Sequence, residues 1–159
     1  GGLDGRAAAD VAAMAAILRR HGAARIGLRG SSMGGYLALV AAAACRADAV
    51  VAICAARAGG LRRGLADGRF DFRADAAALD AFLAAHDELE AAAGLGCPLL
   101  LLHAEGDEQV PAEHSRELHA AAPGSRLVVV PGGHHRSIQH DAELQDLSVR
   151  FLLRAFAGG

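Results

Sequence analysis

Three short segments of the 159-residue sequence carry side chains that together could attack a carbonyl group. The first, Gly30–Gly34, reads G-x-S-x-G with Ser32 at its centre, and it lies between a predicted strand and a predicted helix. Such a tight turn needs small neighbours, and it lifts the central hydroxyl off the sheet. The pattern predicts Ser32 as a nucleophile, and a glycine-rich turn with a capping serine is the alternative interpretation.

The other two segments supply partners for that serine. Asp107 lies in an acidic loop just after an apolar segment, where its carboxylate could accept a hydrogen bond from an imidazole. His134 and His135 follow another apolar segment, and one of these imidazoles could take the serine proton. A surface histidine pair is the alternative. His103 ends an apolar segment, and we interpret it as a structural histidine.

The sequence predicts neither a metal site nor a cofactor. A zinc site needs three or four ligands at fixed spacing. His114 and His119 are five positions apart, so they do not share one face of a helix. The sequence also lacks the glycine-rich phosphate-binding patterns of nucleotide sites.

Composition excludes several classes of partner. The formal net charge is −2, and arginines supply every basic side chain without forming a basic stripe, so we expect no nucleic-acid partner. No apolar run approaches the roughly 20 residues that cross a bilayer, so we expect no membrane partner. The sequence has three unpaired-looking cysteines and begins without an apolar leader, which favours a cytoplasmic location.

Apolar segments alternate with helical patterns along the chain. Helices are expected over 6–20, 36–45, 113–121 and 141–156, and strands over 25–29, 49–54, 98–103 and 127–130. This alternation predicts a single α/β domain over 1–159, with a parallel sheet of about four strands flanked by helices. All three chemical segments then follow the carboxyl ends of strands, where such sheets place their sites.

The order of the three segments resembles the α/β-hydrolase fold family, in which Ser, acid and His follow strands in that chain order. The stretch 101–111 is similar to the H-G-x-x-D-x-x-V-P stretch of small esterases and dienelactone-hydrolase-like members, with Ala104 in place of the glycine. A G-A-x-H pattern placed on 132–135 selects His135, and a G-x-G-H pattern placed on 131–134 selects His134. The His-Arg-Ser that follows favours His135.

The resemblance implies a serine hydrolase that acts on a carboxylic ester or a related small acyl substrate through an acyl-enzyme intermediate. His135, or His134 in its place, would take the proton of Ser32, and Asp107 would orient that imidazole. The backbone N–H of Met33 would hold the oxyanion. No metal or other cofactor takes part.

The segment 55–96 is expected to open with a Gly- and Arg-rich loop, to close with an Ala-rich helix or helix pair, and to act as a lid. Its large apolar residues would line the acyl pocket: Phe70, Phe72, Phe82 and Leu83. We interpret the arginines of its loop as a solvated surface rather than as contacts for an acidic substrate; they include Arg57, Arg62 and Arg63.

The resemblance also implies that the chain corresponds to the C-terminal half of an α/β hydrolase. The strand 25–29 (Arg25 to Arg29) would then present a bare edge, which an N-terminal half or a second copy of the chain could cover. The alternative function is a non-catalytic hydrolase remnant that serves as an interaction module.

Overall fold

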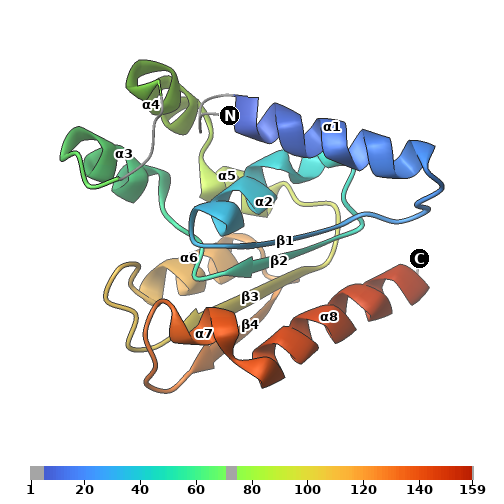
Figure 1. The fold of residues 1–159 in the computed structure, drawn as a ribbon. Helices are drawn as coiled ribbons and strands as arrows, with labels where there is room; N and C mark the ends of the chain where they lie inside the picture. Colours follow the sequence, from blue (N-terminus) through green and yellow to red (C-terminus); the bar gives the residue numbers. More distant parts are fainter. Residues whose placement is uncertain (1–5, 71–74, 159) are drawn as a thin grey trace.

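The computed structural model describes residues 6–70 and 75–158, so Phe72 lies outside the described residues. Within these residues, four strands form one parallel sheet in the order β1-β2-β3-β4 (Figure 1). The strands are β1 (Gly27–Ser31), β2 (Ala49–Ile53), β3 (Leu99–Ala104) and β4 (Arg126–Val130). The predicted α/β class, with a parallel sheet of about four strands, is confirmed.

Helices cover both faces of this sheet (Figure 1). They are α1 (Arg6–Arg20), α2 (Met33–Cys45), α3 (Ala58–Ala66), α4 (Ala76–Ala85), α5 (Glu88–Ala93), α6 (Glu113–Ala121), α7 (Ser137–His140) and α8 (Ala142–Ala157). On one face, α2, α5 and α6 pack apolar side chains against β2 and β3, and α1 lies against α2. On the opposite face, α7 and α8 pack against the same two strands.

The central strands explain the most apolar part of the sequence. Every residue of β2 and β3 is buried, as expected for parallel strands covered on both faces. Leu100, Leu101 and Leu102 are 0% exposed, and full burial of one leucine side chain stabilises a fold by about 2 kcal/mol. This apolar run therefore anchors the sheet whose ends carry the candidate site.

Two predicted boundaries around Ser32 are wrong by a few residues. The strand spans Gly27–Ser31 rather than 25–29, and the next helix begins at Met33 rather than at Tyr36. The N–H of Tyr36 donates to the Ser32 carbonyl over 3.1 Å, which closes the first helical turn. Of the glycines that predict a turn here, Gly30 therefore belongs to β1 and Gly34 to the start of α2.

The Gly- and Arg-rich segment after β2 forms the helix α3, so the loop predicted there is wrong. Ala58, Leu61 and Gly64 recur every three residues and are buried. Their side of α3 packs against α4, and the helix has no room for a larger side chain at Gly64, where an added Cβ would lie 2.7 Å from the Phe70 ring. The predicted helix pair is confirmed as α4 and α5.

β1 forms one edge of the described sheet, since among the described residues it pairs only with β2. This agrees with the bare edge predicted for the strand that precedes Ser32. The side chain of Arg29 leaves β1 toward α8, where its Nε donates to the Ser148 hydroxyl over 2.9 Å. The partner that would cover the edge stays a prediction.

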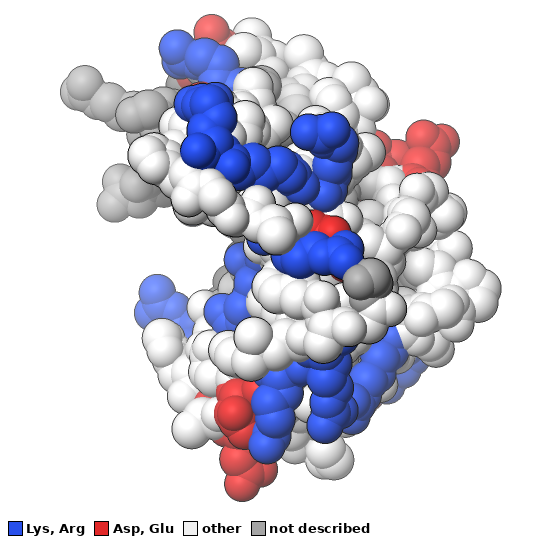
Figure 2. Space-filling view, turned by 90° about the vertical axis from the view of Figure 1, so that its right-hand side faces the viewer, with Lys and Arg blue, Asp and Glu red and all other residues white. Residues whose placement is uncertain are grey.

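Figure 2 shows the molecule from the side on which α1 and α8 end. Arginines are spread over this face from its top to its bottom, with acidic residues among them (Figure 2). Arg19 and Arg20 lie in the last turn of α1, where cations stabilise the helix dipole. None of the helices within 6–70 and 75–158 is long and apolar enough to cross a membrane.

Candidate active site

The three chemical segments follow β1, β3 and β4 at one edge of the sheet. Ser32 comes directly after β1, Asp107 lies in the loop after β3, and His135 lies in the loop after β4. Because the strands are parallel, their carboxyl ends lie together. The sheet thus gathers residues that are far apart in the sequence.

The backbone at Ser32 is strained. Its φ of 54° and ψ of −120° lie outside the regions that residues other than glycine usually adopt. Hydrogen bonds hold it there: its N–H donates to Ile53 over 2.9 Å, and its carbonyl accepts from Tyr36 and Ala56. The sequence predicts such a strained turn from the flanking glycines. Met33 opens α2, so its backbone N–H has no acceptor within the helix.

Gly30 makes this turn sterically possible. A Cβ at position 30 would lie 2.0 Å from the carbonyl oxygen of Gly34, which belongs to the backbone and cannot rotate away. We expect Gly30→Ala to lower the free energy of unfolding by about 3 kcal/mol, because the clash displaces the start of α2. Denaturant unfolding followed by circular dichroism measures this loss.

Gly34→Ala is the matched control, since a Cβ at that position meets nothing within 4 Å. Alanine there is expected to change the free energy of unfolding by less than about 1 kcal/mol. Equal destabilisation by the two substitutions would contradict the steric explanation.

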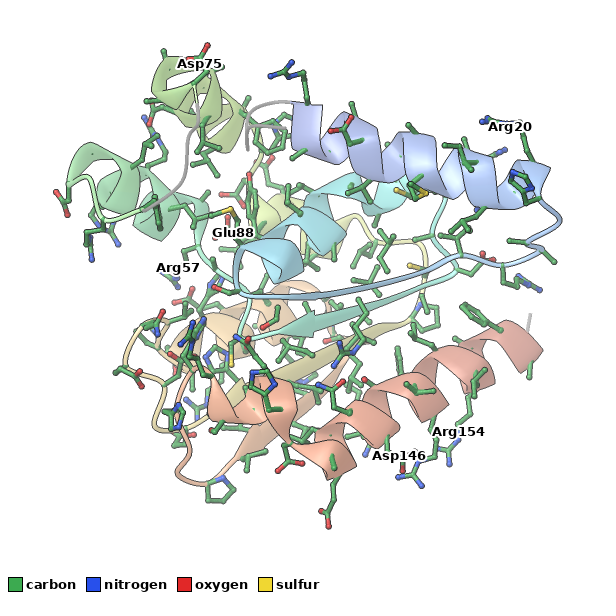
Figure 3. All side chains as sticks on the ribbon, in the orientation of Figure 1. Arg20, Arg57, Asp75, Glu88, Asp146 and Arg154 are labelled. Carbon is green, nitrogen blue, oxygen red and sulfur yellow. The ribbon has the colours of Figure 1, made fainter. Side chains whose placement is uncertain are left out.

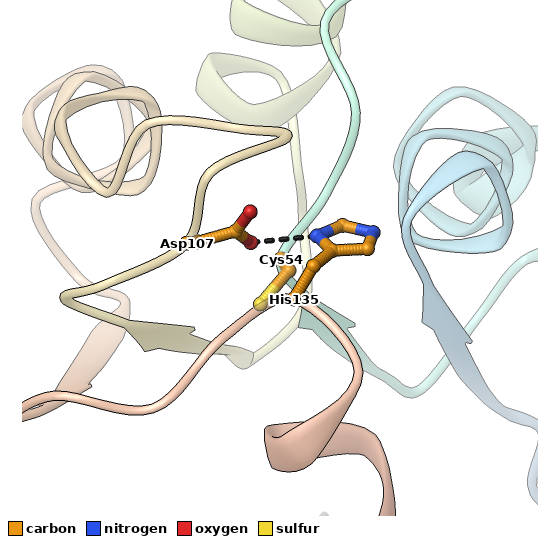
Figure 4. A group of neighbouring side chains, drawn as sticks. All are labelled: Cys54, Asp107 and His135. Atoms are coloured by element: carbon orange, nitrogen blue, oxygen red, sulfur yellow. Dashed lines mark hydrogen bonds and ion pairs between the residues drawn. The ribbon is translucent and has the colours of Figure 1, made fainter.

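Asp107 and His135 form a buried hydrogen-bonded pair (Figure 4). The distance from His135 Nδ1 to Asp107 Oδ2 is 2.6 Å, and the side chains are 5% and 0% exposed. A carboxylate can only accept, so Nδ1 carries the proton, and in the neutral ring Nε2 keeps its lone pair. In Figure 4, Nε2 points away from Asp107 toward the side on which the blue segments β1 and α2 lie. The imidazole is thus oriented to act as a base.

The surroundings of Asp107 favour its ionised form. Burial alone would raise its pKa, but hydrogen bonds from the Val110 N–H, from His135 and from the Gln109 N–H lower the pKa below its usual value. Both backbone N–H groups donate to Oδ1 over 2.9 Å. The carboxylate therefore stays charged at neutral pH and can stabilise a protonated His135.

His134 and Ser32 do not join this pair through hydrogen bonds. His134 is exposed, and its Nδ1 accepts from the Ser137 N–H over 3.3 Å. The Ser32 hydroxyl makes no hydrogen bond with either histidine among the described residues. It lines a cleft of about 620 Å³, bounded by α3 on one side and by residues 108–111 on the other.

His103 is a structural residue, as predicted. It is fully buried, its Nε2 donates to the Val110 carbonyl over 2.9 Å, and its Nδ1 accepts from the Ser115 hydroxyl over 2.6 Å. Burial lowers the pKa of His103 and keeps its ring neutral. It fixes the far end of the loop that carries Asp107.

Cys54 is a neighbour of the pair that sequence reasoning assigns to the core. It directly follows β2 with a φ of 42°, and its sulfur lies within 4.8 Å of ligand atoms of Asp107 and His135. Burial raises the pKa of this thiol to about 12, so it is protonated at neutral pH. The sequence does indicate this position, because Cys54 lies at the carboxyl end of a predicted strand, as the three chemical segments do.

These three groups have the ligand types of a metal site but not its spacing. Two nitrogen or oxygen ligand atoms bound to one tetrahedral zinc ion at 2.0–2.1 Å lie about 3.3 Å apart. Asp107 and His135 are closer, at 2.6 Å, and share a proton. Their geometry is that of a hydrogen bond.

Of the predicted pocket residues, Phe70 lines the cleft beside Ser32. Phe82 and Leu83 instead pack against Tyr36 in an apolar cluster between α2, α3 and α4. With Phe70 and Met33 they line a separate small apolar pocket, so their role in the acyl pocket stays a prediction. The lid role of 55–96 stays a prediction.

A cluster of polar and charged groups, in which His114 and Glu88 are buried, supports one wall of the cleft. Arg57 Nε donates to His114 Nδ1 over 3.0 Å, and its guanidinium pairs with Glu117. Glu88 is buried, lies 3.6 Å from His114 Nε2 and accepts from the Ala58 N–H over 3.1 Å. Figure 3 shows Arg57 and Glu88 near each other at this end of the molecule. The cluster joins the start of α3 to α5 and α6.

His114 makes the fold sensitive to acid. Burial, helped by the nearby charge of Arg57 and by His103, lowers its pKa from 6.5 to about 4. The unfolded chain therefore binds more protons between these values, and stability is lost as the pH falls from 6.5 to 4. The loss due to His114 is about 3 kcal/mol, since each pKa unit corresponds to about 1.4 kcal/mol.

His114→Gln is expected to flatten this pH dependence in denaturant unfolding curves recorded between pH 7 and pH 4. His119→Gln, on the same helix, is the control and is expected to keep it. The shift at His103 is present in both variants, so their difference isolates His114. A His114→Gln curve as steep as that of the unchanged protein would refute the assignment.

Comparisons with known proteins agree with this architecture. The α/β-hydrolase family described as TAP-like protein matches residues 83–156. A putative carbamate hydrolase RutD of Klebsiella pneumoniae is 44% identical over 52 residues, which are 33% of this chain and 20% of that protein. The chain thus aligns with about a fifth of the length of this curated relative.

Solved structures resemble almost the whole chain. Est1E from Butyrivibrio proteoclasticus superimposes with a TM-score of 0.67 at 20% identity, over 91% of this chain and 68% of that one. A thermophilic esterase from Thermogutta terrifontis gives a TM-score of 0.71 at 22% identity, over 97% and 73%.

The sheet topology and these likenesses define the class: the protein has the α/β-hydrolase fold. Within that fold, Ser32, Asp107 and His135 follow the parallel strands β1, β3 and β4.

Proposed function

We propose that the protein is a serine hydrolase that cleaves a carboxylic ester or a related small acyl substrate. The observation that carries the proposal is the buried Asp107–His135 hydrogen bond at the same sheet edge as the strained Ser32 turn. The esterase and hydrolase names of proteins with the same fold support it. No metal or other cofactor takes part in the proposed reaction.

In the proposed reaction, the Ser32 oxygen attacks the carbonyl carbon while its proton passes to Nε2 of His135. Asp107 stabilises the imidazolium that forms, and the backbone N–H of Met33 donates to the oxyanion. His135 then gives the proton to the leaving oxygen, and an acyl-serine remains. Water attacks this ester by the same route, which releases the acid and restores Ser32.

The proposal assigns the base to His135 rather than to His134. His135 is buried and bonded to an ionised carboxylate, whereas His134 is exposed and bonded to the backbone of Ser137. The proposal requires a hydrogen bond between the Ser32 hydroxyl and Nε2 of His135 when substrate is bound, since catalytic hydrogen bonds often tighten only in the complex.

A non-catalytic interaction module is the second candidate. The edge strand β1 supports it, because its free side could pair with an N-terminal half or with a second copy of the chain. The free cysteines Cys45, Cys54 and Cys97 support a cytoplasmic location for either function.

A fluorophosphonate probe separates the two functions, because it forms a covalent bond only with an activated serine. Labelling that peptide mass mapping places on residue 32 would support the hydrolase. Folded protein, with a cooperative thermal transition, that takes up no label would refute it and leave the interaction module.

A further inference from the structure

One wall of the cleft that contains Ser32 carries three arginines. Arg57, Arg63 and Arg69 all line it, and they come from the start of α3, its middle and the segment that follows it. Glu108 lines the opposite wall, on the loop after β3, and no ion pair joins it to an arginine among the described residues. The arginine wall would therefore attract a negatively charged group of the substrate, and the wall with Glu108 would repel it.

Arg57 is held in a fixed orientation. The contacts of its guanidinium with His114 and Glu117 use two of its five N–H donors. The side chain is 41% exposed, so the remaining donors are open to the solvent of the cleft. A guanidinium oriented in advance loses little entropy when it binds a planar anion.

Arg63 carries the uncompensated charge of this wall. Arg69 is paired with Asp67 over 2.9 Å, whereas Arg63 has no acidic partner within residues 6–70 and 75–158. Its neighbour Arg62 points to the other side of α3, where it forms a two-point ion pair with Asp80. Arg62 is therefore neutralised by an ion pair outside the cleft, whereas the adjacent Arg63 lines the cleft without an acidic partner among the described residues.

We propose that the acyl part of the substrate bears a carboxylate, which Arg63 binds with help from Arg57. The inference rests on the proposed hydrolase function and adds the substrate class. A single negative charge would balance the one unpaired arginine of the wall, and the fork of a guanidinium matches the two oxygens of a carboxylate. The loop arginines are then binding residues rather than solvated surface.

The test compares two p-nitrophenyl esters of equal chain length. The hemisuccinate carries a free carboxylate at the end of its acyl group, and the butyrate is neutral. The measured quantity is the ratio of kcat/KM for hemisuccinate to that for butyrate, which cancels general losses of activity. The unchanged protein is expected to prefer the hemisuccinate, and 0.5 M NaCl is expected to reduce that preference.

Arg63→Gln is expected to lower the ratio about tenfold, the effect of losing one charged hydrogen-bonding partner. Arg62→Gln is the matched control, since it removes the same charge one residue away but outside the cleft, and its ratio is expected to stay within about twofold. Glu108→Gln removes a negative charge from the facing wall, so its ratio is expected to rise. Thermal unfolding of each variant verifies the fold.

The outcomes distinguish the two levels of inference. If Ser32-dependent hydrolysis of the butyrate is found but Arg63→Gln and Arg62→Gln leave the same ratio, the carboxylate inference is wrong and the hydrolase proposal stands. If neither ester is hydrolysed, or if hydrolysis survives in Ser32→Ala, the hydrolase proposal fails and the carboxylate inference falls with it.

Discussion

Ser32→Ala is expected to reduce p-nitrophenyl acetate hydrolysis at least about 10³-fold, because no other described hydroxyl follows β1 in the strained turn. Alanine keeps the small side chain that the turn requires, so the fold is expected to survive. Initial rates at pH 7.5, corrected for spontaneous hydrolysis, measure the loss.

Ser31→Ala is the matched control for this prediction. The Ser31 hydroxyl is buried and has no hydrogen-bond partner among the described residues, so its removal eliminates an unsatisfied polar group. Turnover is expected to stay within about threefold, and stability is expected to stay equal or to rise. Loss of activity in Ser31→Ala with retention in Ser32→Ala would overturn the choice of nucleophile.

His135→Ala is expected to lower kcat about 10³-fold, whereas His134→Ala is expected to change it by less than about threefold. Removal of His135 takes away the proton acceptor and also leaves the buried Asp107 carboxylate without one of its donors. His134 is exposed, and its hydrogen bonds within the described part of the chain are with Ser137 at the start of α7.

The two variants are compared at equal concentration, with p-nitrophenyl acetate and with the fluorophosphonate probe. This comparison decides which histidine is the base. Both readouts depend on proton transfer from the serine, so they are expected to fall together in His135→Ala. If only His134→Ala abolishes them, the base is the other histidine and the Asp107–His135 bond is structural.

Local patterns predict the parts of the site that local geometry determines. Gly30, two residues before Ser32, predicts the strained turn, because a Cβ at that position would meet the backbone of Gly34. Apolar strands followed by Asp107 and by a histidine predict that these groups meet, because parallel strands end at one edge. The structure places His135 on Asp107 with the spacing that a hydrogen bond needs.

The parts that sequence reasoning misses depend on contacts between distant segments. The glycines of α3 disfavour a helix locally, and the packing of Leu61 against α4 outweighs them. Cys54 looks like any small core residue until β2 and β3 are aligned, which brings its sulfur to Asp107. The fixed orientation of Arg57 needs His114 on α6, and no local pattern connects the two.

The order of the strands has a consequence for how the chain reaches its native state. Gly27 pairs with Ala49, and Val50 pairs with Leu99, so every strand contact closes a long loop. Folding with such a high contact order is slow, since the chain loses loop entropy before pairing compensates for it. Asp107 and His135 lie in the loops that follow β3 and β4, so their hydrogen bond can form only once these two strands have paired, and it is lost when they separate.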